Sequence, residues 1–202
     1  MTWFRRTPLA AARWVVIDCE TSGLDPTHDR LLSVAAVEVA DGRIAARCSY
    51  AAVLRQREPS SDDNILVHGL GADAQLGGIP APQALRELAE FMDDGIPAAF
   101  HAPFDREVLA TAFTQAKIGF AKKRWLDLAV LAPLLFSRKP GTDLDSWLAE
   151  FRIDCPARHD ALSDAYATAQ LLLVALGEAN RQGIATAEAL LGIESSAKWV
   201  PV

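Results

Sequence analysis

The chain has 202 residues, of which 50% are hydrophobic, and a net charge of −6 at pH 7. This length and apolar content fit one compact α/β domain with a proper core, and no stretch approaches the roughly 20 apolar residues that span a membrane. The acidic balance argues against a protein that holds long duplex nucleic acid, because such proteins normally present a basic face. It remains compatible with an enzyme that holds a chain end through bound cations.

The cysteines and the beginning of the sequence predict a cytoplasmic protein. Cys19, Cys48 and Cys155 lack the paired spacing of metal or redox motifs, so we expect reduced thiols. Arginines interrupt every apolar run before residue 14, which argues against a secretory signal.

The first part of the chain predicts an antiparallel meander of three strands. Residues 14–19 form an apolar run typical of a buried strand, and residues 31–40 alternate loosely and are rich in Val and Ala. The Asp41-Gly42 pair is a strong hairpin-turn signal, after which residues 43–53 return as a third strand.

The remainder predicts helices that alternate with short strands, after a polar loop. The whole pattern is typical of an α/β fold with a mixed five-stranded sheet flanked by helices. We expect one domain over residues 1–202, with an N-terminal arm (1–12) and a short C-terminal extension (178–202). The predicted segments are a loop over 55–80, strands over 96–100 and 124–126, and helices over 82–92, 105–115, 127–136, 143–151, 161–179 and 186–191.

Two carboxylates end the first predicted strand. Side chains alternate between the faces of a strand, so Asp18 and Glu20 point one way and Cys19 the other. Neighbouring carboxylates at the end of a buried strand repel each other and lose solvation, which a bound cation relieves. Oxygen ligands select Mg²⁺ or Mn²⁺. Alternatively, the pair is an ordinary surface feature that leads into a turn.

Asp105 follows a predicted strand and begins a helix, which aims its carboxylate at the strand ends. The same position also suits a helix N-cap, a frequent structural use of Asp. The two interpretations stay open for this residue taken alone.

His159 and Asp164 lie five residues apart, about 140° of rotation on a helix, so one helix face does not hold both. We therefore place Asp164 inside a helix and His159 on the loop before it. An imidazole on a loop can reach a substrate and titrates near neutral pH, which suits proton transfer. The alternative is a capped helix start, with Asp160 as the N-cap and His159 at the surface.

Three blocks of sequence resemble the motifs of the DEDDh 3′–5′ exonucleases. This group of the RNase H-like superfamily includes the epsilon subunit of DNA polymerase III and RNase T. The resemblance covers roughly residues 13–176, and NILVHGL (64–70) resembles the family segment between the first two motifs. The motif blocks are VVIDCETSGLDP, FHAPFDREVL and RHDALSDAYATAQLL.

The resemblance implies a fold, a metal site and a reaction. Asp18, Glu20, Asp105 and Asp164 would bind two Mg²⁺ or Mn²⁺ ions, and His159 would deprotonate the attacking water. The product would be a nucleoside 5′-monophosphate. Family positions that contact the terminal nucleotide correspond to Thr21, Leu24, His68 and Phe104, and a pocket of apolar and aromatic walls would bind any base by stacking.

Two features depart from the family pattern. The second motif often carries Asn four residues before its Asp, where this chain has His101. The segment after the third motif is short, with no evident extension that would tether a polymerase, so a polymerase partner is not established. We expect the basic and aromatic start (3–6) to be a loosely ordered or packed terminus, with a nucleic-acid or partner contact as the alternative. We expect Trp199 to cover a neighbouring apolar surface rather than dock on a partner.

Three functions are compatible with these residues. The first is a metal-dependent 3′–5′ exonuclease that acts on single-stranded or frayed DNA ends. The second is an exoribonuclease of the RNase T or oligoribonuclease type that trims RNA ends, since the motifs serve both sugars. The third is a non-catalytic module that binds a polymerase or nucleic acid, which the presence of all five motif residues disfavours.

Overall fold

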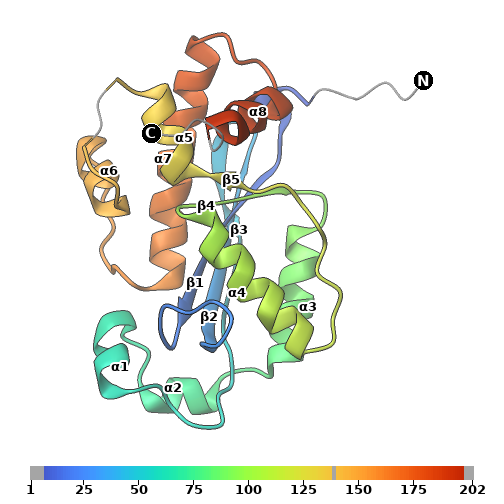
Figure 1. Ribbon diagram of the computed structural model, residues 1–202, viewed down its shortest axis with the longest axis vertical. Helices are drawn as coiled ribbons and strands as arrows, with labels where there is room; N and C mark the ends of the chain where they lie inside the picture. Colours follow the sequence, from blue (N-terminus) through green and yellow to red (C-terminus); the bar gives the residue numbers. More distant parts are fainter. Residues whose placement is uncertain (1–6, 138–139, 198–202) are drawn as a thin grey trace.

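The computed structural model describes residues 7–137 and 140–197. A mixed five-stranded sheet forms its centre, in the strand order β3-β2-β1-β4-β5 (Figure 1). Strands β1, β2 and β3 pair antiparallel, and β4 and β5 continue the sheet parallel to β1. The predicted meander and five-stranded sheet are confirmed. The strands are β1 (Trp14–Thr21), β2 (Leu31–Ala40), β3 (Arg43–Val53), β4 (Ile96–Ala99) and β5 (Leu126–Asp127).

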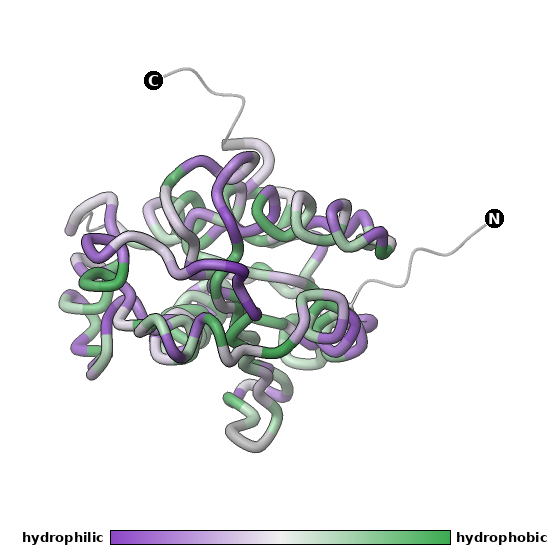
Figure 2. Tube along the Cα trace, turned by 90° about the horizontal axis from the view of Figure 1, so that it is seen from below, coloured by the Kyte–Doolittle hydropathy of each residue, from purple (hydrophilic) through white to green (hydrophobic). Residues whose placement is uncertain are grey.

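Helices cover both faces of the sheet (Figure 1). In Figure 2, hydrophobic and hydrophilic stretches alternate along the helices, as expected for elements that bury one face. The helices are η1 (Leu9–Ala11), α1 (Asp62–His68), α2 (Ala72–Gly77), α3 (Ala81–Met92), α4 (Ala102–Gln115), α5 (Leu128–Leu135), α6 (Leu144–Glu150), α7 (Ala161–Arg181) and α8 (Ala187–Ala197). Within the described ranges, none of them is long and apolar enough to cross a membrane.

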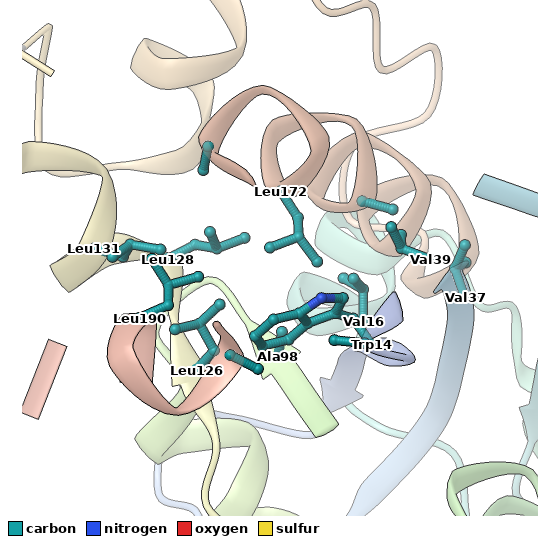
Figure 3. Packing of buried hydrophobic residues seen from close by; sticks show 14 of the residues in the cluster. Trp14, Val16, Val37, Val39, Ala98, Leu126, Leu128, Leu131, Leu172 and Leu190 are labelled. Atoms are coloured by element: carbon teal, nitrogen blue, oxygen red, sulfur yellow. The ribbon is translucent and has the colours of Figure 1, made fainter. Parts of the chain in front are cut away.

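Strand β1 is the centre of the core because it is buried on both faces. Trp14 and Val16 pack into a cluster with residues of α5, α7 and α8 (Figure 3). Val15, Ile17 and Cys19 pack on the opposite face, against residues of α3 and α4. The alternation of the strand therefore assigns each following side chain to one of these two layers.

The predicted loop over 55–80 is wrong in its middle, which contains α1 and α2. The Ser61 side chain accepts a hydrogen bond from Asn64 N at the start of α1, and Gly69 ends the helix in the left-handed conformation. Two of the polar residues that favoured a loop are acidic side chains in the first turn of this helix. The polar composition of this segment therefore favoured a loop, although its capping residues form the short helix α1.

The ends of the described chain pack against each other. Pro8 forms an isolated bridge with Thr186, and Leu9 N donates to Ala185 O over 3.0 Å. Leu9 is buried in the same cluster as Leu190 of α8. The predictions for residues 3–6 and for Trp199 lie outside the described residues.

Candidate active site

Strand alternation places the two carboxylates of β1 on the α7 face of the sheet. Asp18 and Glu20 continue the row of Trp14 and Val16, and both are partly exposed at the end of the strand. Asp164, in the first turn of α7, faces them and is 4% exposed. Carboxylate oxygens of Asp18, Glu20 and Asp164 all lie within 4.8 Å of one another. Three of the four predicted metal ligands are thus brought together.

Small side chains allow α7 to lie close to the sheet. The core face of the helix carries five alanines spaced one to two turns apart, and they are fully buried or nearly so. The helix consequently contacts both β1 and β2 along its length. The first turn is fixed by Asp160, whose side chain accepts a hydrogen bond from Ser163 N. These alanines are Ala161, Ala165, Ala169, Ala175 and Ala179.

Asp105 reaches the site from the opposite layer. It lies on the fourth residue of α4, is 5% exposed, and accepts a hydrogen bond from the Cys19 thiol. It is outside the group formed by the other three carboxylates, although its charge acts on Asp18. The N-cap position of α4 belongs to His101, so the alternative use of Asp105 as the N-cap is wrong.

The acidic side chains hold their protons more tightly than usual. Burial, together with the charges of Asp105, Glu20 and Asp164, raises the pKa of Asp18 well above its ordinary value. Burial and the neighbouring carboxylates raise the pKa of Glu20 to about 8, and burial raises that of Asp105 to about 7. Accumulated negative charge of this kind is what a bound cation neutralises.

Arg158 is the cation that faces these carboxylates. It donates to Asp164 Oδ1 through Nη1 and to Asp145 Oδ1 through Nε. The Cys155 thiol lies 3.2 Å from the same Asp164 oxygen, and His159 N donates to Asp164 Oδ2 over 2.9 Å. The charge of Arg158 lowers the pKa of both β1 carboxyl groups, against the larger effect of burial.

His159 lies on the loop before α7, as predicted, with an exposed side chain and a φ of 62°. A cleft of about 240 Å³ is lined by His159, the β1 carboxylates and Asp164, together with Phe100, His101 and Leu144. His101 also has a left-handed backbone, with a φ of 63°. Asn and His both tolerate this conformation, which explains how His101 stands where the family often carries Asn.

The loop between β1 and β2 presents Leu24 to solvent, with 91% of its surface exposed. Asp29 accepts hydrogen bonds from Ser22 Oγ (3.0 Å) and Asp25 N (2.8 Å), which fixes the loop. A Cβ at Gly23 would lie 2.5 Å from Asp29 Oδ2, so any larger residue there would displace the carboxylate that fixes the loop. The loop is therefore ordered by its own contacts while its leucine remains uncovered.

Three other predicted substrate residues are more enclosed. Thr21 is 8% exposed and donates from Oγ1 to Gly23 O over 2.6 Å. His68, 5% exposed, accepts from Leu70 N and lies 2.8 Å from Asn64 Oδ1, and burial lowers its pKa. Phe104 is partly buried against the α3 and α4 layer. Their contacts with a nucleotide stay predictions.

Comparison with known proteins identifies the family. A family model described as an exonuclease, RNase_T, matches residues 15–172. The chain belongs to the DEDDh 3′–5′ exonucleases. It is 30% identical over 177 residues to a DNA polymerase III PolC-type protein of Halalkalibacterium halodurans, and 32% identical over 189 residues to a DNA polymerase III subunit epsilon-like protein of Rhodobacter capsulatus. These matches cover 88% and 92% of this chain but only 12% and 27% of the relatives.

Solved structures show the same fold. E. coli exonuclease I in complex with a dT13 oligonucleotide matches with a TM-score of 0.74 at 14% identity, over 86% of this chain and 43% of that chain. The nuclease domain of 3′hExo, a DEDDh family member bound to rAMP, matches with a TM-score of 0.72 at 15% identity, over 83% and 93%. The RNase H-like fold expected from the motifs is confirmed.

The donor set at this site fits divalent metal ions, which the family generally uses. The group consists of carboxylate oxygens, which suit Mg²⁺ or Mn²⁺. No His nitrogen joins the group among the described residues. Burial and the bond to Asp164 raise the pKa of the Cys155 thiol to about 11, so in the metal-free site this thiol is neutral at neutral pH.

Sequence reasoning missed several groups that hold the candidate site in place. Arg158, Asp145 and Asn64 were not singled out, although Arg158 adjoins the motif histidine. Asn64 donates from Nδ2 to Thr21 O over 3.0 Å and thereby ties α1 to β1. Asp127, buried at the end of β5, accepts from His101 N over 3.2 Å. Arg158 and Asn64 lie within the motif segments, which was the only signal for them, whereas Asp145 and Asp127 lie outside these segments and had no signal in the sequence.

We predict that the metal-free protein becomes less stable as pH rises from about 4 to about 8. Glu20 and Asp105 have pKa values of about 8 and about 7 in the folded chain, against ordinary values of 4.5 and 3.8. The folded chain therefore binds more protons than the unfolded chain across this interval, so each rise in pH favours unfolding. Urea unfolding in EDTA at several pH values measures the effect.

Glu20→Gln should make this part of the stability profile shallower, because it removes one of the titrating groups. Glu90→Gln, at an exposed position on α3, serves as the control and should leave the slope as in the parent. A parent protein with equal stability at pH 5 and pH 8 would contradict the described electrostatics.

Proposed function

We propose that this chain is a metal-dependent 3′–5′ exonuclease that releases nucleoside 5′-monophosphates from DNA ends. The supporting observation is the meeting of Asp18, Glu20 and Asp164 within 4.8 Å beside the exposed His159. Because the chain belongs to an exonuclease family, we assign this cluster to phosphodiester hydrolysis. A non-catalytic module would have no need to keep three carboxylates and a histidine in one cleft, with the charge of Asp105 acting on them from behind.

Asp18, Glu20, Asp105 and Asp164 would hold two Mg²⁺ or Mn²⁺ ions. When bound, the ions would supply an acidified water and stabilise negative charge on the phosphate oxygens. The role of the protein is to keep carboxylates close together in spite of their repulsion. The core packing around β1 and the close approach of α7 supply that rigidity.

His159 would accept the proton of the attacking water. Its side chain is exposed and lines the cleft with the carboxylates, so it can reach a water molecule there. Asp164 Oδ2 holds the backbone N–H of His159 over 2.9 Å, which couples the position of the histidine to that of a ligand. Such a bond orients the base relative to the site without occupying the imidazole.

Leu24 and Phe104 would contact the terminal nucleotide, with Thr21 and His68 beside them. The exposed leucine on an ordered loop is available to pack against a base. Apolar contact is indifferent to the base, so we expect degradation of any sequence. The net charge of −6 favours contact with a short single-stranded or frayed end over a long duplex.

DNA is the substrate that the relatives favour. The matched relatives are named for DNA polymerase III, and the matched exonuclease I was solved with a DNA oligonucleotide. The 3′hExo domain bound rAMP, which makes RNA trimming the second candidate. A polymerase partner follows only from the names of relatives that are far longer than this chain. The three free cysteines suit the reducing cytoplasm that we expect.

We predict that Asp18→Asn lowers the rate of hydrolysis by about 10³-fold or more, because a ligand of the proposed ions is lost. The metal-free variant should remain folded and gain stability at pH 8, since one repelling charge is removed. Release of nucleotides from oligothymidylate with Mn²⁺ measures the rate. Asp154→Asn, at an exposed position, is the matched control. Hydrolysis at the parent rate by Asp18→Asn would disprove the assignment.

His159→Asn should lower the rate at neutral pH by about 10²-fold or more, because general base catalysis is lost. Asn suits the left-handed backbone at this position, so the exchange tests the imidazole and not the loop. Raising the pH should partly restore the rate by supplying hydroxide. His101→Asn makes the same exchange at the other left-handed residue of the cleft and should stay active. A pH–rate profile identical to that of the parent would exclude His159 as the base.

Competition between DNA and RNA oligomers of one sequence tests the substrate. We expect 5′-labelled single-stranded DNA to shorten from its 3′ end faster than RNA, and only with Mg²⁺ or Mn²⁺ present. The ladder of labelled products reports polarity, sugar preference and metal requirement together. Faster loss of RNA would assign the enzyme to the RNA-trimming alternative.

A further inference from the structure

Arg158 stands where an incoming metal ion would need to bind. Asp164 is a proposed metal ligand, yet both of its oxygens already have donors. Oδ1 accepts from the Arg158 guanidinium and the Cys155 thiol, and Oδ2 accepts from the His159 backbone. The side chain of Asp164 is only 6% exposed. A metal ion on Oδ1 would lie close to the guanidinium and be repelled by it, so the two cations compete for this carboxylate and metal binding favours departure of the guanidinium.

The second ion pair of Arg158 keeps it at the cleft after that release. Its Nε donates to Asp145 on α6, whereas its Nη1 donates to Asp164 on α7. The two carboxylates thus hold different nitrogens of one guanidinium. Loss of the Asp164 contact frees Nη1 and leaves the Nε contact in place. The side chain is 28% exposed and lines the cleft, so it is accessible to a ligand there.

A phosphate is the chemical group that this freed edge fits. A guanidinium presents a planar fork of N–H donors that matches two phosphate oxygens. Within the part of the chain that the structure describes, Arg158 is the only Lys or Arg that lines the cleft, whose other charged groups are mostly acidic. An anionic nucleic acid backbone therefore has one permanently positive side chain to contact in this cleft.

We propose that Arg158 exchanges partners, neutralising Asp164 in the metal-free protein and binding a phosphate of the nucleic acid once a metal ion takes its place. This inference rests on the proposed metal-dependent function. It assigns to Arg158 two roles, as a competitor of the metal ion and as a substrate-binding residue. Asp145 is the positioning residue that holds the guanidinium within reach of both.

The first test measures Mn²⁺ binding by isothermal titration calorimetry without nucleic acid. Arg158→Gln should bind Mn²⁺ several-fold more tightly than the parent, because a competing and repelling charge is removed. Arg152→Gln, an exposed arginine six residues earlier with no ion pair among the described contacts, should match the parent. Equal or weaker binding by Arg158→Gln would overturn the exchange.

The second test measures affinity for an oligothymidylate with phosphorothioate linkages, which resists hydrolysis, at saturating Ca²⁺. Arg158→Gln should bind it about tenfold more weakly, the effect of losing one charged hydrogen-bonding partner. The affinity of Arg158→Lys should lie between those of the parent and Arg158→Gln, because lysine keeps the positive charge but lacks the planar pair of N–H donors. Parent-like affinity in Arg158→Gln would overturn the phosphate contact.

A third measurement separates this inference from the function on which it rests. Thermal unfolding in EDTA should show a lower midpoint for Arg158→Gln than for Arg152→Gln, since only the former loses the pairs with Asp145 and Asp164. An unchanged midpoint would overturn the pairing even if the parent binds Mn²⁺. If the parent itself binds no Mn²⁺, the proposed function fails and the exchange fails with it.

Discussion

Repulsion between carboxylates is the constraint on which the rest of this structure depends. Asp18 and Glu20 share one face of a buried strand, and α7 brings Asp164 up to them. Isolated, these groups would move apart or take up protons, and their raised pKa values express that tendency. Apolar packing on both sides of β1 offsets the cost, because Trp14 and Ile17 are almost completely buried in opposite layers.

The site is assembled from two layers that meet only at the end of β1. Asp164 approaches from the α7 layer, and Asp105 approaches from the α4 layer beside Cys19. The alternation of a single strand decides this division, since residues 18 and 20 face one helix and residue 19 faces the other. The cleft thereby draws ligands from elements that are far apart in sequence.

Local patterns in the sequence were enough for the meander, for the loop position of His159 and for the Asp160 cap, because period, turn chemistry and capping involve near neighbours. The two short helices in 55–80 were missed, since the cap of α1 lies within a polar run that is typical of loops and α2 has no side-chain cap. Tertiary contacts could not be predicted from local sequence patterns either. The pairing of Arg158 with Asp145, and the turn of Asp105 toward Cys19, depend on how helices pack across the sheet.

The left-handed backbone at His101 and His159 has a consequence for how this cleft tolerates change. At both positions the main chain disfavours β-branched side chains before any chemistry is considered. Gly, Asn, Asp and His adopt this conformation more readily than most residues, and three of these four carry a polar side chain. The left-handed backbone at residues 101 and 159 therefore favours polar side chains at the edge of the cleft, and such side chains can bind ligands or transfer protons.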